Sequence, residues 1–295
     1  MLQTTVGQMS DYVSPDDYGR LLKTYSFGGK TDLQMLEEFL RFNFDIQSGV
    51  RGSIHSALEL GCGTGRSTDV ILNSTNVDSL TLLDLSPHML DAVRAKYAQH
   101  SGMQFEQSDT VKYLEKSNNQ FDLICSMWSF SHSVHQVLDT HAYLNDVFRV
   151  QDAVRRMVNV MMKPGAHFYM MHVDSLSDEQ RMLFRQWARA FPMFGDTEHQ
   201  TPSKLLTDNV LQELQQNGEI TDLAIQEHSG DPIEYASMDE ALDACLNFHL
   251  ESFFNERPEA EEVADDLHSA LKAYEQDDGR IVIHPGSITY QFQKA

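Results

Sequence analysis

The sequence predicts an α/β fold whose central sheet consists mostly of parallel strands. Between residues 54 and 173, short apolar runs alternate with segments of helical periodicity, the order expected for a parallel sheet covered by helices on both faces. The first run ends at Leu60 and opens into a loop with glycines at positions 61, 63 and 65. Near the end of the chain, residues 279–292 alternate between apolar and polar side chains, which predicts an antiparallel last strand.

The segment before the core is predicted to form an N-terminal helical cap over residues 1–49. Apolar residues recur at i, i+3, i+4 and i+7 from Leu33 to Leu40, which indicates a helix over residues 32–42. Thr31 is a suitable N-cap for this helix. The aromatic and glycine-rich run at 25–31 is expected to be a hinge that folds over a pocket.

The core is predicted to span residues 50–237 together with 279–295. Its strands are expected at residues 54–60, 79–85, 103–106, 121–127, 167–173 and 220–227. Its helices are expected after the glycine loop and at residues 86–97, 111–115, 140–162, 177–191 and 203–217. A helical insertion at 238–278, with helices over 238–255 and 259–275, precedes the last strand and is expected to shape a substrate pocket.

Composition narrows the classes of function. The chain has 295 residues, 22 basic against 44 acidic side chains, and a formal net charge of −22. Because proteins that grip nucleic acid need Lys and Arg to neutralise phosphates, this balance argues against a nucleic-acid partner and against an anionic membrane. No stretch approaches the ~20 apolar residues of a membrane span. The three cysteines lie far apart, so we expect reduced thiols in a cytoplasmic protein.

The loop after the first core strand carries the strongest functional signal. Its order is G-x-G-x-G, which differs from the G-x-G-x-x-G of dinucleotide-binding proteins and lacks the Gly-Lys-Ser/Thr of a phosphate-binding loop. Glu59 lies two positions before the first glycine, and a carboxylate there suits a ligand with positive charge. This E-x-G-x-G-x-G arrangement resembles the first motif of class I S-adenosylmethionine (SAM) methyltransferases. The resemblance implies a Rossmann-like sheet, SAM as cofactor and an enzyme that transfers methyl groups.

Further candidate cofactor contacts follow the other strands in the order that this resemblance implies. Asp84 ends the second strand, where a carboxylate can accept hydrogen bonds from both ribose hydroxyls. The resemblance places an acid or its neighbour after the third strand against the adenine amino group, and Ser108-Asp109 takes that position. The expected cofactor-binding residues are Glu59, Gly61, Cys62, Gly63, Gly65, Asp84, Leu85, Ser108, Asp109 and Ser126.

The layout outside the core is similar to that of the histamine N-methyltransferase group. The similar segments are residues 18–22, 31–39 and 279–290. In that family an acidic residue after a threonine binds the substrate ammonium, and Asp32 takes its position here. The chain departs from the family at the glycine loop, where the family has I-G-G-G-A-G. It also has Trp128 and the His284-Pro285 region in place of a glutamine and an asparagine, so the resemblance implies a nitrogen acceptor without implying histamine.

The acceptor is therefore expected to be a small molecule methylated on an amine or imidazole nitrogen. The expected pocket residues are Tyr25, Phe27, Asp32, Trp128, His132 and His284. Aromatic faces attract cations and a carboxylate adds a charge-assisted hydrogen bond. His132, Trp128 and Asp32 are the candidate catalytic residues, with His132 as a general base because a pKa near ~6.5 suits proton removal at neutral pH.

Several alternatives stay open at this point. Asp32 could merely cap its helix, Trp128 could be a core residue, and His132 with His135 could be structural. The spacing of His132 and His135 does not predict a metal site. The acceptor atom could be oxygen or carbon, or the protein could bind SAM for another reaction. A monomer or a homodimer is expected, with a small-molecule substrate as its only partner.

Overall fold

The computed structural model describes residues 15, 25–44, 54–138, 143–173, 177–190, 201–250 and 253–295. Within these ranges the main sheet has seven strands in the order β5-β4-β3-β6-β7-β11-β8. In that order they are Met103–Gln107, Ser79–Asp84, Ser56–Leu60, Phe121–Met127, Met162–Val173, Gly286–Lys294 and Ile220–Ser229. Only β11 runs antiparallel to its neighbours, so the predicted α/β fold with a mostly parallel sheet is confirmed.

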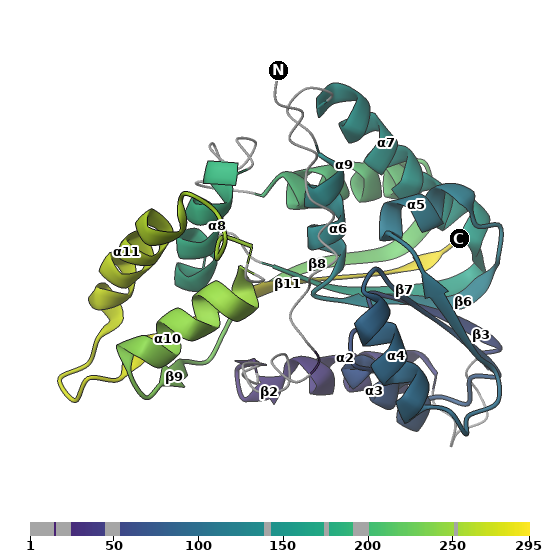
Figure 1. Cartoon of the computed structure of the whole chain (residues 1–295). Coiled ribbons are helices and arrows are strands. Elements are labelled where there is room, and N and C mark those ends of the chain that lie inside the picture. The colour runs from purple at the N-terminus through teal and green to yellow at the C-terminus, as the bar shows by residue number, and fades with distance from the viewer. Residues whose placement is uncertain are drawn as a thin grey trace.

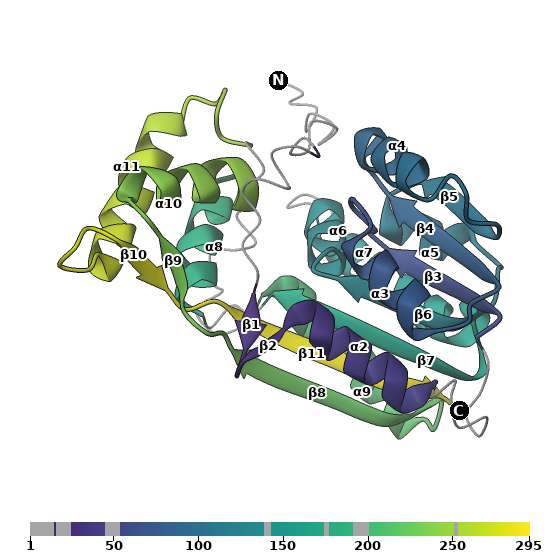
Figure 2. The same cartoon turned by 90° about the horizontal axis from the view of Figure 1, so that it is seen from below.

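Helices cover both faces of this sheet (Figures 1 and 2). One face carries α2 (Asp32–Asn43), α3 (Arg66–Ser74) and α4 (Pro87–Lys96). The other carries α5 (Thr110–Lys116), α6 (Phe130–Val137), α7 (Tyr143–Arg156) and α9 (Pro202–Gln216). Ala57 packs in the core on the first face and Leu58 in the core on the second. Burial on both faces explains why the core strands are continuous apolar runs in the sequence.

Local signals place the helix starts. Thr31 caps α2 through a capping box, in which its hydroxyl accepts from the Gln34 backbone N–H and the Gln34 side chain accepts from the Thr31 N–H. Ser86 caps α4, and Pro87 occupies its first turn. Before α2, Gly28 and Gly29 adopt positive φ and close a hairpin between β1 (Ser26–Phe27) and β2 (Lys30–Thr31) where a hinge was expected.

A second group of elements forms what we call the helical lobe, residues 177–190, 233–250 and 253–283. It contains α8 (Asp178–Ala190), α10 (Met238–Ala244) and α11 (Ala260–Leu271) around a two-stranded sheet of β9 (Ile233–Tyr235) and β10 (Ile281–Ile283). Figure 2 shows the lobe beside the sheet, at the end where β8 leads into β9 and β10 leads into β11. Gly230 N–H donates to the Pro285 carbonyl (2.8 Å), which ties these two connections together.

The last strand and several helix bounds differ from the sequence prediction. The segment 279–292 is two strands in two different sheets, because Pro285 lacks an N–H and interrupts the ladder between β10 and β11. The helix expected over 140–162 ends at Arg156 in a π-helical turn, Met157–Met161. The helix expected over 238–255 likewise turns π-helical at Cys245–His249.

Two further points concern the predicted organisation. Helix α6 was not predicted, because its apolar positions Phe130 and Val134 are separated by serines and a histidine that leave no clear helical period in so short a segment. The 18–22 run that carried part of the family resemblance lies outside the described residues. The division into a cap at 1–49, a core and an insertion at 238–278 stays a proposal, although β9 and β10 pair with each other rather than with the main sheet.

Candidate cofactor and acceptor site

The glycine loop is held against β4 and β6 at close range. The N–H groups of Gly61 and Cys62 both donate to the Leu83 carbonyl (2.8 and 3.0 Å). A Cβ added at Gly61 would lie 1.8 Å from the Ser129 hydroxyl oxygen, so glycine is required for this approach. At Gly63, by contrast, an added Cβ meets no atom of the described residues within 4 Å, so this turn faces space that they leave open. Its φ of 51° is left-handed, which also favours glycine.

Asp84 lies beside this open turn. Its carboxylate accepts from the Gly63 N–H (2.8 Å) and from the Ser86 N–H (2.9 Å). Burial raises the pKa of Asp84, and these backbone donors oppose that rise. The structure therefore brings together the loop and the carboxylate that the sequence assigned to one site, with Leu85 next in the chain.

Glu59 has hydrogen-bond partners within the protein. Its buried carboxylate accepts from the hydroxyls of Ser67 and Thr68 (2.6 Å for Thr68) on the first turn of α3. Burial raises its pKa to about 7, while the two hydroxyl donors lower it. Glu59 thus anchors α3 to β3, and its direct contact with the cofactor stays a prediction.

The serines and the aspartate at the other strand ends also have structural partners. Asp109 caps α5 by accepting from the Lys112 N–H (2.9 Å), and the Ser108 N–H donates to the Asp84 carbonyl (3.1 Å). The hydroxyls of Ser126 and Ser129 both donate to the Leu60 carbonyl (3.1 and 2.9 Å). These residues share one sheet edge with Asp84, and Ser108 and Asp109 remain candidates for the adenine side.

Asp32 is committed to the protein itself, although the sequence assigned it to a substrate ammonium. Its side chain is 1% exposed and pairs with the Arg66 guanidinium, with both carboxylate oxygens 3.3 Å from Nη2. It also accepts from the Trp128 indole N–H (3.0 Å) and from the Leu33 N–H (2.9 Å). Since Arg66 neutralises its charge, Asp32 is a poor site for a second cation.

Trp128 holds an unusual backbone conformation at the end of β6. Its φ is 66°, a left-handed value that a bulky residue adopts only where its surroundings impose it. The backbone N–H of Trp128 donates to the Met171 carbonyl (2.9 Å). Its ring centroid lies 5.2 Å from that of Tyr25 and 6.3 Å from that of Phe27. Tyr25, Phe27 and Trp128, three of the expected pocket residues, therefore form an aromatic wall.

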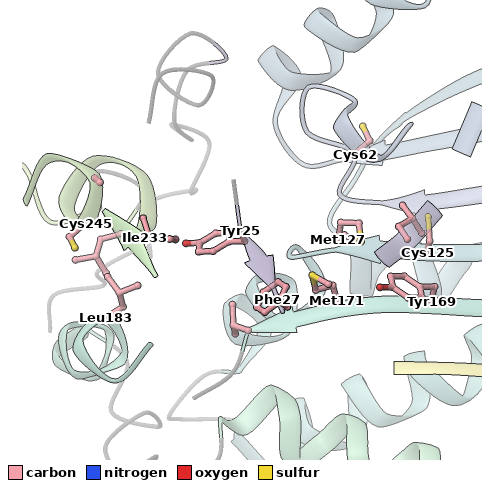
Figure 3. Close-up of a cluster of buried hydrophobic side chains, with 14 of the residues drawn as sticks. Tyr25, Phe27, Cys62, Cys125, Met127, Tyr169, Met171, Leu183, Ile233 and Cys245 are labelled. Carbon is pink, nitrogen blue, oxygen red and sulfur yellow. The ribbon is translucent and has the colours of Figure 1, made fainter. Parts of the chain in front are cut away.

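Beyond this wall the structure shows a polar cluster that the sequence prediction missed. The Tyr25 hydroxyl donates to both carboxylate oxygens of Glu179 in α8 (3.0 and 3.1 Å). His249 Nε2 lies 3.5 Å from Glu179 Oε1. Figure 3 shows the Tyr25 ring between the core strands and the Ile233 and Cys245 side chains of the helical lobe. The available signal was Glu179 itself, an acid at helical spacing from the apolar Leu183 and Trp187.

The two predicted pocket histidines, His132 and His284, have different surroundings. Burial lowers the pKa of His132 to about 4, so its imidazole is neutral at pH 7 and a weak proton acceptor. His284 is exposed, and its Nδ1 lies 3.3 Å from the Gly230 carbonyl at the junction with the helical lobe. Phe27 faces His228 (ring centroids 6.0 Å apart) and lines a groove of about 780 Å³ between α2 and the strands β8 and β11.

No group of three or more His, Cys, Asp and Glu side chains within the described residues is arranged to hold a metal ion. Among the helices found there, none is both long enough and apolar enough to cross a membrane.

Part of the chain is similar in sequence to known methyltransferases. Residues 57–152 match a family described as a methyltransferase domain. A demethylmenaquinone methyltransferase of Leptospira interrogans is 28% identical over 137 residues, which are 45% of this chain and 49% of that protein. A malonyl-[acyl-carrier protein] O-methyltransferase of a Paenibacillus species is 30% identical over 115 residues, 38% and 42% of the two chains. The chain thus spans about half the length of the curated relatives it matches.

A solved structure covers more of the chain. The cyclopropane synthase MmaA2 of Mycobacterium tuberculosis aligns over 99% of this chain and 100% of its own, with a TM-score of 0.51 and 13% identity. At that identity the match concerns the fold, which is the Rossmann-like fold predicted from the sequence.

Proposed function

We propose, from the premise that residues 57–152 form a class I SAM-dependent methyltransferase domain, that this protein methylates a nitrogen of a small-molecule amine or imidazole. The observation that carries the proposal is the open turn at Gly63 with Asp84 hydrogen-bonded to it. The net charge of −22 also suits a cationic acceptor better than an anionic one.

The residues at the glycine loop fit SAM. A ligand can approach the Gly63 backbone because no side chain of the described residues occupies the space there. Asp84 is well placed to accept from ribose hydroxyls, and Leu85, Ser108 and Asp109 border the same edge for the adenine side. When bound, SAM supplies an electrophilic methyl group on a sulfonium. The protein would orient the acceptor and exclude water around it, and the Tyr25–Trp128 wall is suited to both tasks.

Methylation of an oxygen is the second candidate. One matching relative is named an O-methyltransferase of malonyl-[acyl-carrier protein]. Incubation with methyl-labelled SAM and separate panels of amines, imidazoles, phenols and carboxylic acids decides between the two. Label in amines or imidazoles supports the proposal, and label only in the other panels replaces nitrogen by oxygen.

The cofactor assignment predicts a specific loss. We expect Asp84→Ala to weaken SAM binding at least tenfold, about 1.4 kcal/mol, because the ribose loses its acceptor and the Gly63 turn loses its anchor. Isothermal titration calorimetry measures this loss. Asp91→Ala, which removes an exposed carboxylate from the same helix α4, is the matched control. Unchanged affinity in Asp84→Ala would contradict the assignment.

A further inference from the structure

Glu179 lies in a buried cluster drawn from four separate elements. We define the Glu179 cluster as Tyr25 next to β1, Glu179 in α8, Tyr235 in β9, and Cys245 with His249 in the π-helical turn after α10. Glu179 is 2% exposed, and Tyr25 donates to both of its carboxylate oxygens. The cluster thus joins the N-terminal hairpin to the helical lobe through one carboxylate.

Among the described residues, the basic side chain paired with this carboxylate is His249, whose Nε2 lies 3.5 Å from Glu179 Oε1 and which carries a charge only when protonated. The ionisable neighbours of Glu179 are uncharged near pH 7. Burial raises the pKa of Tyr25 and of Tyr235 above the usual tyrosine range, raises that of Cys245 to about 12, and lowers that of His249 to about 4. Burial also raises the pKa of Glu179 to about 7, against the effect of its Tyr25 hydrogen bonds. A buried carboxylate without a countercharge favours the approach of a cation or the uptake of a proton.

The backbone around His249 places its side chain in the cluster. The π-helical turn Cys245–His249 directly follows α10 and ends the helix that begins at Met238. His249 Nε2 thereby lies 3.5 Å from Glu179 Oε1.

The cluster is also close to the cofactor loop. Tyr25 stands between Glu179 and Trp128, with its ring centroid 5.2 Å from that of Trp128 and 6.5 Å from that of His249. Ser129, which follows Trp128 in the chain, packs against Gly61 so closely that a Cβ added at Gly61 would overlap the Ser129 side chain. The Glu179 carboxylate, the Tyr25 and Trp128 rings and the glycine loop therefore follow one another from the lobe to the sheet edge.

We propose that Glu179, rather than Asp32, binds the ammonium group of the acceptor amine and takes its proton. This inference rests on the proposed function. The N–H proton passes to a Glu179 oxygen and leaves the nitrogen lone pair free. That lone pair then forms the N–CH₃ bond as the S–CH₃ bond of the sulfonium donor breaks, and the sulfur keeps the electron pair as a neutral thioether. Tyr25 and Trp128 supply ring faces for the cation, and Tyr25 holds the carboxylate in place.

Ligand binding without any methyl donor tests this assignment directly. The probe is 2-phenylethylamine, and 2-phenylethanol is a neutral control of nearly the same shape. By calorimetry we expect the wild type to bind the amine at least tenfold more tightly than the alcohol at pH 8. We expect the preference to shrink toward pH 6 as Glu179 is protonated, while the amine stays protonated in this range because its pKa is about 10. Equal binding of the two probes at pH 8 would overturn the proposal.

Variants identify the carboxylate responsible. Glu179→Gln should abolish the preference for the amine and its pH dependence, with SAM affinity unchanged. Glu261→Gln removes one charge from an exposed site of the same lobe and should preserve both properties. If Glu179→Gln fails to fold, Tyr25→Phe keeps the carboxylate but removes its hydrogen-bond donor, which should shift the pH dependence upward. An unaltered amine preference in a folded Glu179→Gln protein refutes the role of Glu179.

A turnover assay separates this inference from the proposed function. Label transfer from SAM to amines in the wild type, together with equal turnover by Glu179→Gln, would leave the function intact and contradict the inference alone. SAM binding without transfer to any amine, imidazole, phenol or acid would contradict the function itself.

Discussion

Two glycines of one loop have opposite environments. Gly61 is required because Ser129 fills the space that a side chain would need, whereas Gly63 turns toward space that no described side chain occupies. The first glycine is therefore needed for folding of the loop. The second is favoured by its left-handed φ of 51°, and its missing side chain also leaves room for a ligand, such as a nucleoside, to approach the backbone.

This difference predicts a separation of stability from binding. Gly63→Ala should lower the free energy of unfolding by only about 1 kcal/mol, the cost of a left-handed alanine, but weaken SAM binding at least tenfold. Gly61→Ala should lose more stability because its new methyl group overlaps Ser129. Urea denaturation and calorimetry on the two variants test this. A Gly63→Ala protein that binds SAM normally would show that the cofactor does not contact this turn.

At the level of elements, one carboxylate connects three of them. Asp32 begins α2, Arg66 begins α3, and Trp128 follows β6. The bonds of Asp32 therefore tie α2 to the residue that follows the glycine loop and to the end of β6. An isolated buried charge is costly, but here the guanidinium and the indole N–H compensate for it. The left-handed backbone of Trp128 is stabilised by the same contact.

We therefore expect Asp32→Asn to lower the free energy of unfolding by about 1–3 kcal/mol, as expected when a buried charge-assisted hydrogen bond is lost. The partly exposed Arg66 can regain water, which limits the cost. Urea denaturation measures the effect, and a double-mutant cycle with Arg66→Gln isolates the pair. If Asp32→Asn instead keeps its stability and raises only the KM for an amine, the role predicted from the sequence would be correct.

Local patterns in the sequence were sufficient for the core elements and for the loop. Apolar runs, the Ser86-Pro87 start and the glycine spacing are properties of neighbouring residues, and the structure confirms the elements they predict. The partners of Asp32 and Glu179 are 34 and 154 residues away along the chain, and no local pattern encodes such contacts. The hydrogen-bond donors of Glu59 were not predicted for the same reason, because they come from the next helix.

At the level of the whole molecule, several ionisable groups are buried in their uncharged forms. Burial lowers the pKa values of His132, His172 and His249 from 6.5 to about 4. Below pH 6.5 these histidines therefore bind protons in the unfolded chain but stay neutral in the folded protein down to about pH 4. They lower the free energy of unfolding as the pH falls through this range. Glu59 and Glu179 have the opposite effect. Burial raises their pKa from 4.5 to about 7, so between these values the folded protein holds protons that the unfolded chain releases.

These opposing contributions predict how a single substitution changes the response to acid. In Glu59→Gln the extra protonation of the folded state is lost. The free energy of unfolding should then fall more steeply from pH 7 to pH 5 than in the wild type, by at most about 1.4 kcal/mol per pH unit. Chemical denaturation at both pH values provides the comparison. Glu37→Gln, at a site on the exposed part of α2, should leave the wild-type slope unchanged. Parallel curves for wild type and Glu59→Gln would contradict a raised pKa at Glu59.

The paired connections at Gly230 and Pro285 have a mechanical consequence. A Cβ at Gly230 would lie 2.5 Å from the Pro285 ring, so the two backbones run side by side as one ribbon. A two-stranded ribbon bends more easily than it stretches. We therefore expect the helical lobe to move relative to the main sheet by bending at this ribbon rather than by sliding. Asp231 on this ribbon accepts from Ser26 and Gly29 of the hairpin. The hairpin is therefore tied to the same ribbon, and we expect Tyr25 and Glu179 to keep their contact when the lobe moves.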